Sequence, residues 1–123
     1  MASTIICAVI PGPPQSKERP RASKSGRFYT PQATKDAEQS IAEHLITQNR
    51  EAVMDPKARF KVDIHYYQTS RRTDIDNEVK ATLDGITMSR IVWNTDAQVD
   101  ALYAIRTTPN AEGERTELWI TAL

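Results

Sequence analysis

The sequence predicts one α+β domain, built on a mixed β-sheet of about four strands with two main helices packed on one face. Three observations lead to this prediction. Several short runs have strand character, two longer segments have helical spacing, and they follow one another in the order β-α-β-α-β-β. A chain of 123 residues with 39% apolar side chains can bury one core, so the domain is expected to span residues 1–123.

A strand, a loop and a helix are expected in the first half of the chain. Residues 3–10 are rich in β-branched side chains and are predicted to form a buried strand, which the Pro-Gly-Pro-Pro cluster after it ends. A loop then runs to about Tyr29. Thr30 is the expected N-cap and Pro31 the first residue of a helix that continues to about Asn49. The apolar stripe of this helix is expected to comprise Ala33, Ala37, Ile41, Ala42 and Leu45.

A second strand and a second helix are expected after this. Apolar side chains alternate with others over residues 60–67, which predicts a half-buried strand, and a polar loop follows it. The second helix is expected to begin at Asp76 or Asn77 and to end at about Ile86, with Gly85 weakening its end. Its inward-facing residues are expected to be Val79, Leu83 and Ile86.

Two final strands are expected at residues 98–107 and 116–122. The linker at residues 109–114 contains Asn110 and Gly113, and such residues are typical of a hairpin turn. The sequence does not define the order of the strands in the sheet.

The cysteine content and the hydropathy of the chain indicate the cellular compartment in which the protein is expected. The single cysteine, Cys7, can form no internal disulfide, and its apolar surroundings predict a buried structural thiol. The N-terminal apolar run has no basic region before it, and no stretch approaches the roughly 18 apolar residues that span a bilayer. We therefore expect a soluble, cytoplasmic protein without a membrane partner.

Basic residues are unevenly distributed along a chain whose net charge is zero. Residues 15–27 contain five basic side chains and one acid, whereas the rest of the chain carries eleven basic and fifteen acidic groups. A basic loop on a mildly acidic body indicates one face that binds a polyanion. The candidates in this loop are Lys17, Arg19, Arg21, Lys24 and Arg27.

An acidic segment forms the candidate metal site. Asp74 and Asp76 lie two residues apart, which in an extended chain puts both carboxylates on one side, roughly 7 Å apart. Asp96 follows at another turn and is expected to close the site. Converging carboxylates repel one another without a cation, and Mg²⁺ suits such a site because it binds a few carboxylates beside water and phosphate oxygens.

Lys80 adds a positive charge to this site. It falls on the helical face of Asp76 and Asn77, where a lysine beside a metal-bound phosphodiester stabilises developing negative charge or positions the attacking water. Asp84 shares this face and is expected to support the site or lie on the helix surface rather than bind metal. Arg71 and Arg72 precede the acidic pair as phosphate contacts or as solvated loop residues.

Plainer interpretations of these residues stay open. Asp-x-Asp is a common pattern, and Asp76 can be an N-cap with Lys80 as its i,i+4 partner. A calcium-binding loop is excluded because Val79 and Gly85 occupy the positions that require glycine and glutamate. His44 and His65 have no second histidine at ligand spacing, and both are expected to be structural.

Two motifs resemble those of a known family. Residues 71–84, R-R-T-D-I-D-N-E-V-K-A-T-L-D, resemble the D-x-D-N-x-x-K-x-x-x-D signature of the RusA family of Holliday junction resolvases. Residues 93–99, W-N-T-D-A-Q-V, resemble the second motif of that family, an Asp-Ala-Gln-Val shortly after an aromatic residue. One departure is Thr95, since the family often has an acidic residue before the last catalytic aspartate.

The resemblance implies a homodimeric endodeoxyribonuclease that acts in DNA recombination and repair. Such enzymes bind four-way DNA junctions and cut two opposing strands symmetrically with Mg²⁺, and Mn²⁺ is an alternative cofactor. Carried over by position, the catalytic and metal-binding carboxylates fall on Asp74, Asp76 and Asp96, and the essential lysine falls on Lys80. The basic loop and the Arg71–Arg72 pair then become candidate DNA contacts.

Two other functions remain to be separated from this one. The chain could be a nuclease with broader activity on branched DNA such as forks and flaps, which no sequence feature decides. It could also be a non-catalytic DNA-structure-binding protein whose carboxylates are relics, although the intact acidic set argues against relics.

Overall fold

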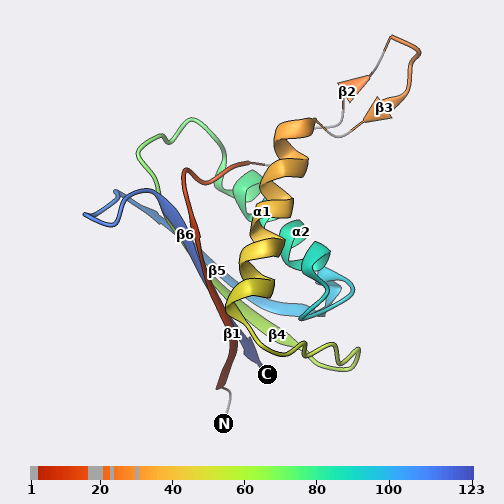
Figure 1. Ribbon diagram of the computed structural model, residues 1–123, viewed down its shortest axis with the longest axis vertical. Helices are drawn as coiled ribbons and strands as arrows, with labels where there is room; N and C mark the ends of the chain where they lie inside the picture. The colour runs from red at the N-terminus through yellow and green to blue at the C-terminus, as the bar shows by residue number, and fades with distance from the viewer. Residues whose placement is uncertain (1–2, 17–20, 23, 30) are drawn as a thin grey trace.

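The computed structural model describes residues 3–16, 21–22, 24–29 and 31–123 (Figure 1). The predicted order of main elements and the predicted α+β class are confirmed. In chain order the elements are β1 (Ser3–Pro11), β2 (Arg21–Ala22), β3 (Phe28–Tyr29), α1 (Gln32–Gln48), β4 (Phe60–Tyr67), α2 (Ile75–Ser89), the 3₁₀ turn η1 (Asp96–Gln98), β5 (Val99–Thr107) and β6 (Arg115–Ala122).

The main sheet has four strands in the order β1-β6-β4-β5. β6 is antiparallel to both β1 and β4, whereas β4 and β5 are parallel, so the sheet is mixed as predicted. The predicted hairpin between β5 and β6 is wrong, because β4 lies between them. β4 takes this inner position because its alternate residues Phe60, Val62, Ile64 and Tyr66 are all buried, while β5 has no fully buried residue and forms an edge.

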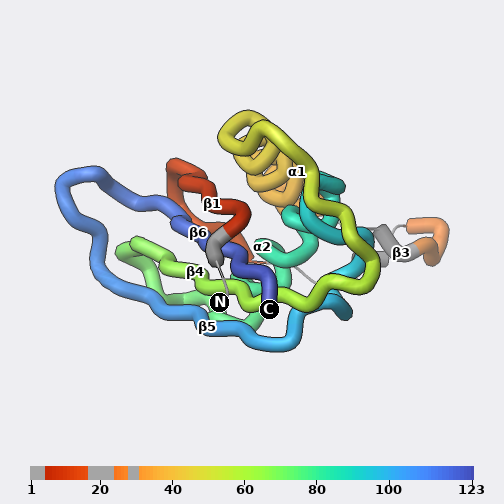
Figure 2. Tube along the Cα trace, turned by 90° about the horizontal axis from the view of Figure 1, so that it is seen from below, coloured from red at the N-terminus to blue at the C-terminus, as the bar shows by residue number. Residues whose placement is uncertain are grey.

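Both helices cover one face of this sheet and leave the other face open (Figures 1 and 2). The core between the layers comprises side chains of β1, β4 and β6 with those of α1 and α2. Trp93, just before η1, is fully buried and lies 5.7 Å from Phe60 between ring centroids. Its indole nitrogen donates to Thr87 Oγ1 at 2.7 Å, which ties the segment after α2 back to that helix.

The open face explains an error in the prediction for β1. Ile6, Ala8 and Ile10 point into the core, but Cys7 and Val9 alternate with them and are exposed. β1 is an edge strand with one covered face, so an apolar run there does not bury every side chain. Cys7 is therefore not the buried thiol that the sequence predicted.

The first turn of α1 differs from the prediction by one residue. Pro31 is the N-cap rather than the first helical residue, and Thr30 lies outside the described residues. The carbonyl of Pro31 accepts hydrogen bonds from the amides of Thr34 and Lys35. The buried stripe is also rotated, since Ala33 is exposed and Ala37 only partly buried. The buried residues are Thr34, Glu38, Ile41, Ala42 and Leu45.

The second helix is longer than predicted. It begins at Ile75 and passes through Gly85 to Ser89, where Arg90 in the left-handed conformation ends it. Gly85 does not weaken an end, because it is buried where α2 crosses α1. A Cβ atom there would lie 2.7 Å from Ile41 Cβ, so only glycine allows this approach. Val79 and Ile86 are buried as predicted, and Leu83 is partly buried.

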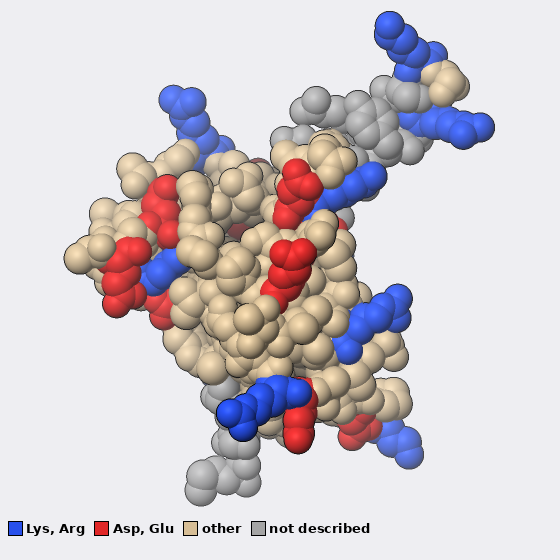
Figure 3. Space-filling model, in the orientation of Figure 1, with Lys and Arg blue, Asp and Glu red and all other residues tan. Residues whose placement is uncertain are grey.

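A short hairpin replaces the expected basic loop over part of its length. β2 and β3 pair in antiparallel fashion and form an arm beyond the N-terminal end of α1 (Figure 1). Lys24 and Arg27 are exposed in this arm, and Gly26, with φ +82°, makes its turn. Lys and Arg side chains gather at the outer end of the arm (Figure 3).

Candidate active site

The acidic pair lies at the start of α2 rather than on an extended strand. Asp74 is the N-cap with extended backbone, and Asp76 is in the first helical turn, so the expected strand-like placement of the two carboxylates is wrong. Both side chains are exposed. The Asp76 carboxylate accepts a hydrogen bond from the amide of Asn77 at 3.0 Å. Acidic residues are favourable at this position because the N-terminal end of a helix carries partial positive charge.

Lys80 joins the two sequence motifs in space. Its Nζ lies 3.0 Å from Asp84 Oδ1, one helical turn on, and 3.3 Å from Asp96 Oδ2 in η1. The hydrogen bond to Asp84, with a further contribution from Asp96, raises the pKa of Lys80, so the amine stays protonated at neutral pH. Asp84 forms an i,i+4 ion pair with Lys80 on this helix.

Buried and exposed side chains hold η1, and with it Asp96, in place. Gln98 is buried, and its side-chain Nε2 donates to the carbonyls of Asp55 and Ala58, both at 2.9 Å. Arg59 Nη2 donates to the carbonyl of Ala97 at 2.9 Å. The glutamine of the Asp-Ala-Gln-Val motif therefore has a structural role, since it anchors the turn before β4 to the segment that carries Asp96.

The candidate metal ligands are brought to one region but not into a closed site. In the described part of the chain, no three His, Cys, Asp or Glu side chains are arranged to hold a metal ion. The structure links Asp96 and Asp84 through Lys80. The donors are nevertheless all carboxylate oxygens on exposed or partly exposed side chains, and this chemistry fits a hard divalent cation.

A buried ion pair beneath the acidic segment was missed by the sequence analysis. Glu78 is fully buried, and its Oε1 accepts a hydrogen bond from Arg106 Nη1 of β5 at 3.0 Å. Burial raises the pKa of Glu78, and Arg106 opposes that shift. One signal was present in the sequence: Glu78 lies four residues before Thr82 on the buried face of α2, where a carboxylate requires a partner.

The basic candidates are dispersed. Arg71 and Arg72 are exposed in the loop before α2, while Lys24 and Arg27 are in the arm. Lys17 and Arg19 lie outside the described residues, and Arg21 is described only through its backbone in β2.

The two histidines have local partners, in agreement with their predicted structural roles. His44 Nδ1 lies 2.7 Å from the carbonyl oxygen of Ser40, and His65 Nε2 lies 2.7 Å from Thr107 Oγ1.

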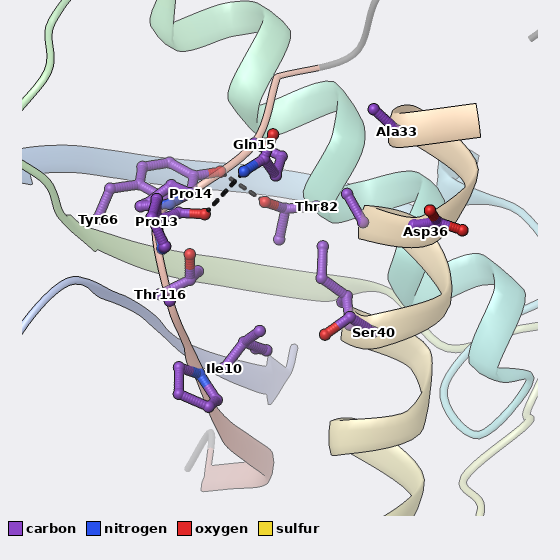
Figure 4. A pocket seen from close by; sticks show the side chains of 14 residues that line it. Ile10, Pro13, Pro14, Gln15, Ala33, Asp36, Ser40, Tyr66, Thr82 and Thr116 are labelled. Carbon is purple, nitrogen blue, oxygen red and sulfur yellow. Dashed lines mark hydrogen bonds between the residues drawn. The ribbon is translucent and has the colours of Figure 1, made fainter. Parts of the chain in front are cut away.

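A separate pocket of about 400 Å³ lies between α1 and the proline-rich segment after β1 (Figure 4). Tyr66 and Thr82 lie at one side of it, and their hydroxyl groups are hydrogen bonded at 2.7 Å. None of the predicted site residues lines this pocket. The candidate active site is therefore the surface at the start of α2 and not this pocket.

Fold and site together define a small α+β protein with a carboxylate–lysine cluster at a helix surface and exposed basic side chains. The sequence matches the endodeoxyribonuclease RusA family over residues 11–121. The chain belongs to this family and is an endodeoxyribonuclease, as its motifs predicted. Comparison with curated proteins gives no match. No helix in the described residues is long and apolar enough to cross a membrane.

Proposed function

We propose that this protein resolves four-way DNA junctions by paired, symmetric cleavage of two opposing strands, with Mg²⁺ as cofactor. RusA family nucleases act on Holliday junctions in DNA recombination. One observation carries the proposal for this chain. Lys80 Nζ lies 3.3 Å from Asp96, although the two residues are 16 positions apart, so both motifs of the family contribute to one surface.

The proposed metal ligands are the carboxylates of Asp74, Asp76 and Asp96. When bound, a divalent cation lowers the pKa of its water and polarises the phosphate. Mg²⁺ fits an all-oxygen donor set, and Mn²⁺ is the alternative.

Lys80 is proposed to act on the phosphate. Its amine is charged at neutral pH and about half exposed, so a phosphate oxygen can replace one of its two carboxylate partners. A fixed positive charge beside the scissile group stabilises negative charge that develops during strand cleavage. Asp84 then keeps the amine on the correct side of the helix.

A homodimer, with one domain per chain over residues 1–123, accounts for paired cleavage. A junction has two-fold character, and a symmetric dimer presents two equivalent sites to two equivalent strands. Sedimentation equilibrium is expected to give twice the chain mass of 13.9 kDa. The basic arm together with Arg71 and Arg72 is proposed to contact DNA phosphates.

Cleavage of defined substrates tests the proposal. The protein is incubated with a synthetic four-way junction, a fork, a flap and linear duplex, each with Mg²⁺, Mn²⁺ or a chelator. We expect symmetric paired nicks in the junction with either metal and none with the chelator. Faster cleavage of forks or flaps would favour the broader nuclease instead. Tight junction binding without cleavage under any condition would favour a DNA-structure-binding protein.

A further inference from the structure

We propose that Arg106 and Glu78 act as positioning residues that hold the Asp74–Asn77 segment in its working geometry. This inference rests on the proposed function for its effect on cleavage. Arg106 Nη1 donates to the carbonyl of Thr73 at 2.6 Å and to Glu78 Oε1 at 3.0 Å. These two acceptors lie immediately before and immediately after the segment, so one donor group on β5 fixes both of its ends.

We call the contacts of Arg106 with Thr73 and Glu78 the clamp. Its residues are held in turn by the neighbouring strands and by α2. Arg106 pairs with Tyr66 in the parallel register of β4 and β5. The Tyr66 hydroxyl meets Thr82 Oγ1 at 2.7 Å, and Thr82 Oγ1 in turn donates to the carbonyl of Glu78 at 3.0 Å. The first turns of α2 are therefore tied to two neighbouring strands, through polar side chains that are buried or mostly buried.

The loop before α2 is attached to the same strand end. The amide of Gln68 donates to the carbonyl of Thr107 at 3.0 Å, and Arg106 holds Thr73 at the other end of the loop. The two ends of the loop are therefore hydrogen bonded to adjacent residues of β5, Thr107 and Arg106. A shift of either residue would move the backbone that carries Asp74.

Stability alone does not account for this pair. Glu78 is fully buried and only 21% of the Arg106 side chain is exposed, so both groups lose much of their hydration. Replacing a buried ion pair by apolar side chains of similar volume is often neutral or stabilising, whereas removing one partner is strongly destabilising. A buried pair placed around the acidic segment is better explained by the geometry that it imposes.

The double variant Glu78→Leu/Arg106→Met separates positioning from folding. It removes both charges together, and we expect a free energy of unfolding close to that of the wild type. Without metal or DNA, amide hydrogen exchange at position 78, whose N–H donates to the Asp74 carbonyl at 3.2 Å, should become at least about tenfold faster. With junction and Mg²⁺, kcat should fall about 10- to 100-fold, and a higher Mg²⁺ concentration should be needed for half-maximal cleavage. Junction affinity measured with a chelator should not change.

Two comparisons make the outcome decisive. Lys61→Gln is the control. It removes the ion pair between Lys61 and Asp63 of β4, which lie 3.7 Å apart on the open face of the sheet. It should change neither the hydrogen exchange at position 78 nor kcat, Mg²⁺ dependence or junction affinity. Unchanged hydrogen exchange at position 78 in the double variant would overturn the clamp, as would wild-type kcat and Mg²⁺ dependence. If the wild type cut no junction, the proposed function would fail, and the exchange measurement would still decide whether the clamp exists.

Discussion

Lys80 occupies the point where the two motifs meet, and its contacts define what it can do. The amine is shared between Asp84 and Asp96, but about half of the side chain is exposed. Exposed ion pairs contribute about 0–1 kcal/mol to stability because water screens them. We therefore expect Lys80 to act on a bound phosphate and to contribute little to folding.

Replacement of this amine is expected to separate catalysis from stability. Lys80→Met keeps the aliphatic stem and should leave the free energy of unfolding within about 1 kcal/mol of the wild type. Cleavage of a four-way junction should slow by about 10²- to 10³-fold, since a fixed charge near the scissile phosphate is lost. Urea unfolding and single-turnover cleavage measure the two effects. Lys35→Met, on the exposed surface of α1, is the matched control and should cleave normally.

The residues of the site differ in how far the sequence could predict them. Asp74, Asp76 and Lys80 are suggested by local spacing, and Asp96 joins them through the second motif of the family resemblance, so these candidates could be named without any knowledge of strand order. The partnership of Glu78 with Arg106 spans 28 positions and depends on β5 pairing in parallel with β4. A local pattern can indicate that a carboxylate on the buried face of α2 requires a partner, but it does not identify Arg106 as that partner.

At the scale of elements, the contact between α1 and α2 depends on Gly85. A Cβ atom there would lie 2.7 Å from Ile41 Cβ and 2.8 Å from Ile41 Cγ2, and neither atom is the far end of a flexible side chain. The helices approach closely at this point, and the faces so joined support the surface of α2 that carries Lys80. The sequence predicted glycine as a weak end of the helix because helix propensity ignores the neighbouring element.

Gly85 is either an unfavourable residue for the helix or the residue that the close contact with α1 requires. A Gly85→Ala substitution distinguishes these two interpretations. Helix propensity alone predicts that Gly85→Ala stabilises the protein by up to about 1 kcal/mol. The close contact with Ile41 instead predicts destabilisation by about 1–3 kcal/mol through overpacking. The midpoint and slope of urea unfolding measure the sign directly. A more stable variant would show that the two helices are not held at this distance.

Strand order lay beyond what the sequence could predict. The predicted ranges of β5 and β6 agree with the structure to within about one residue, and a short polar linker between two strands suits a hairpin. The fully alternating burial of β4 overrides this local preference, because β4 gains pairing partners on both sides when it separates β5 from β6.

At the scale of the whole molecule, a chain of zero net charge can bind DNA because its charges are separated. Lys24 and Arg27 are exposed in the arm. Lys and Arg side chains gather at its outer end (Figure 3). Each phosphate contact releases counterions, so affinity falls with salt in proportion to the number of contacts.

Removal of the basic side chains of the arm should change this salt dependence. Lys24→Ala/Arg27→Ala is expected to weaken junction binding and to reduce the slope of log affinity against log salt by about 0.9 for each lost phosphate contact. Arg50→Ala/Lys57→Ala removes one exposed arginine and one exposed lysine from the segment between α1 and β4 and should leave the slope unchanged. Fluorescence anisotropy with a labelled junction measures both. Equal slopes for the wild type and the arm variant would mean that the arm does not contact DNA.

The central claim is that the surface around Asp76 cuts four-way junctions with the help of a divalent cation. Its most direct test compares Asp76→Asn with the wild type for junction cleavage with Mg²⁺ and for junction binding with a chelator. Asp36→Asn is the matched control, since Asp36 is another exposed helical aspartate, hydrogen bonded to Gln32 at 2.8 Å. We predict that Asp76→Asn binds the junction as tightly as the wild type but makes no paired nicks, while Asp36→Asn cuts normally. Cleavage by Asp76→Asn at the wild-type rate would contradict the assignment of the active site.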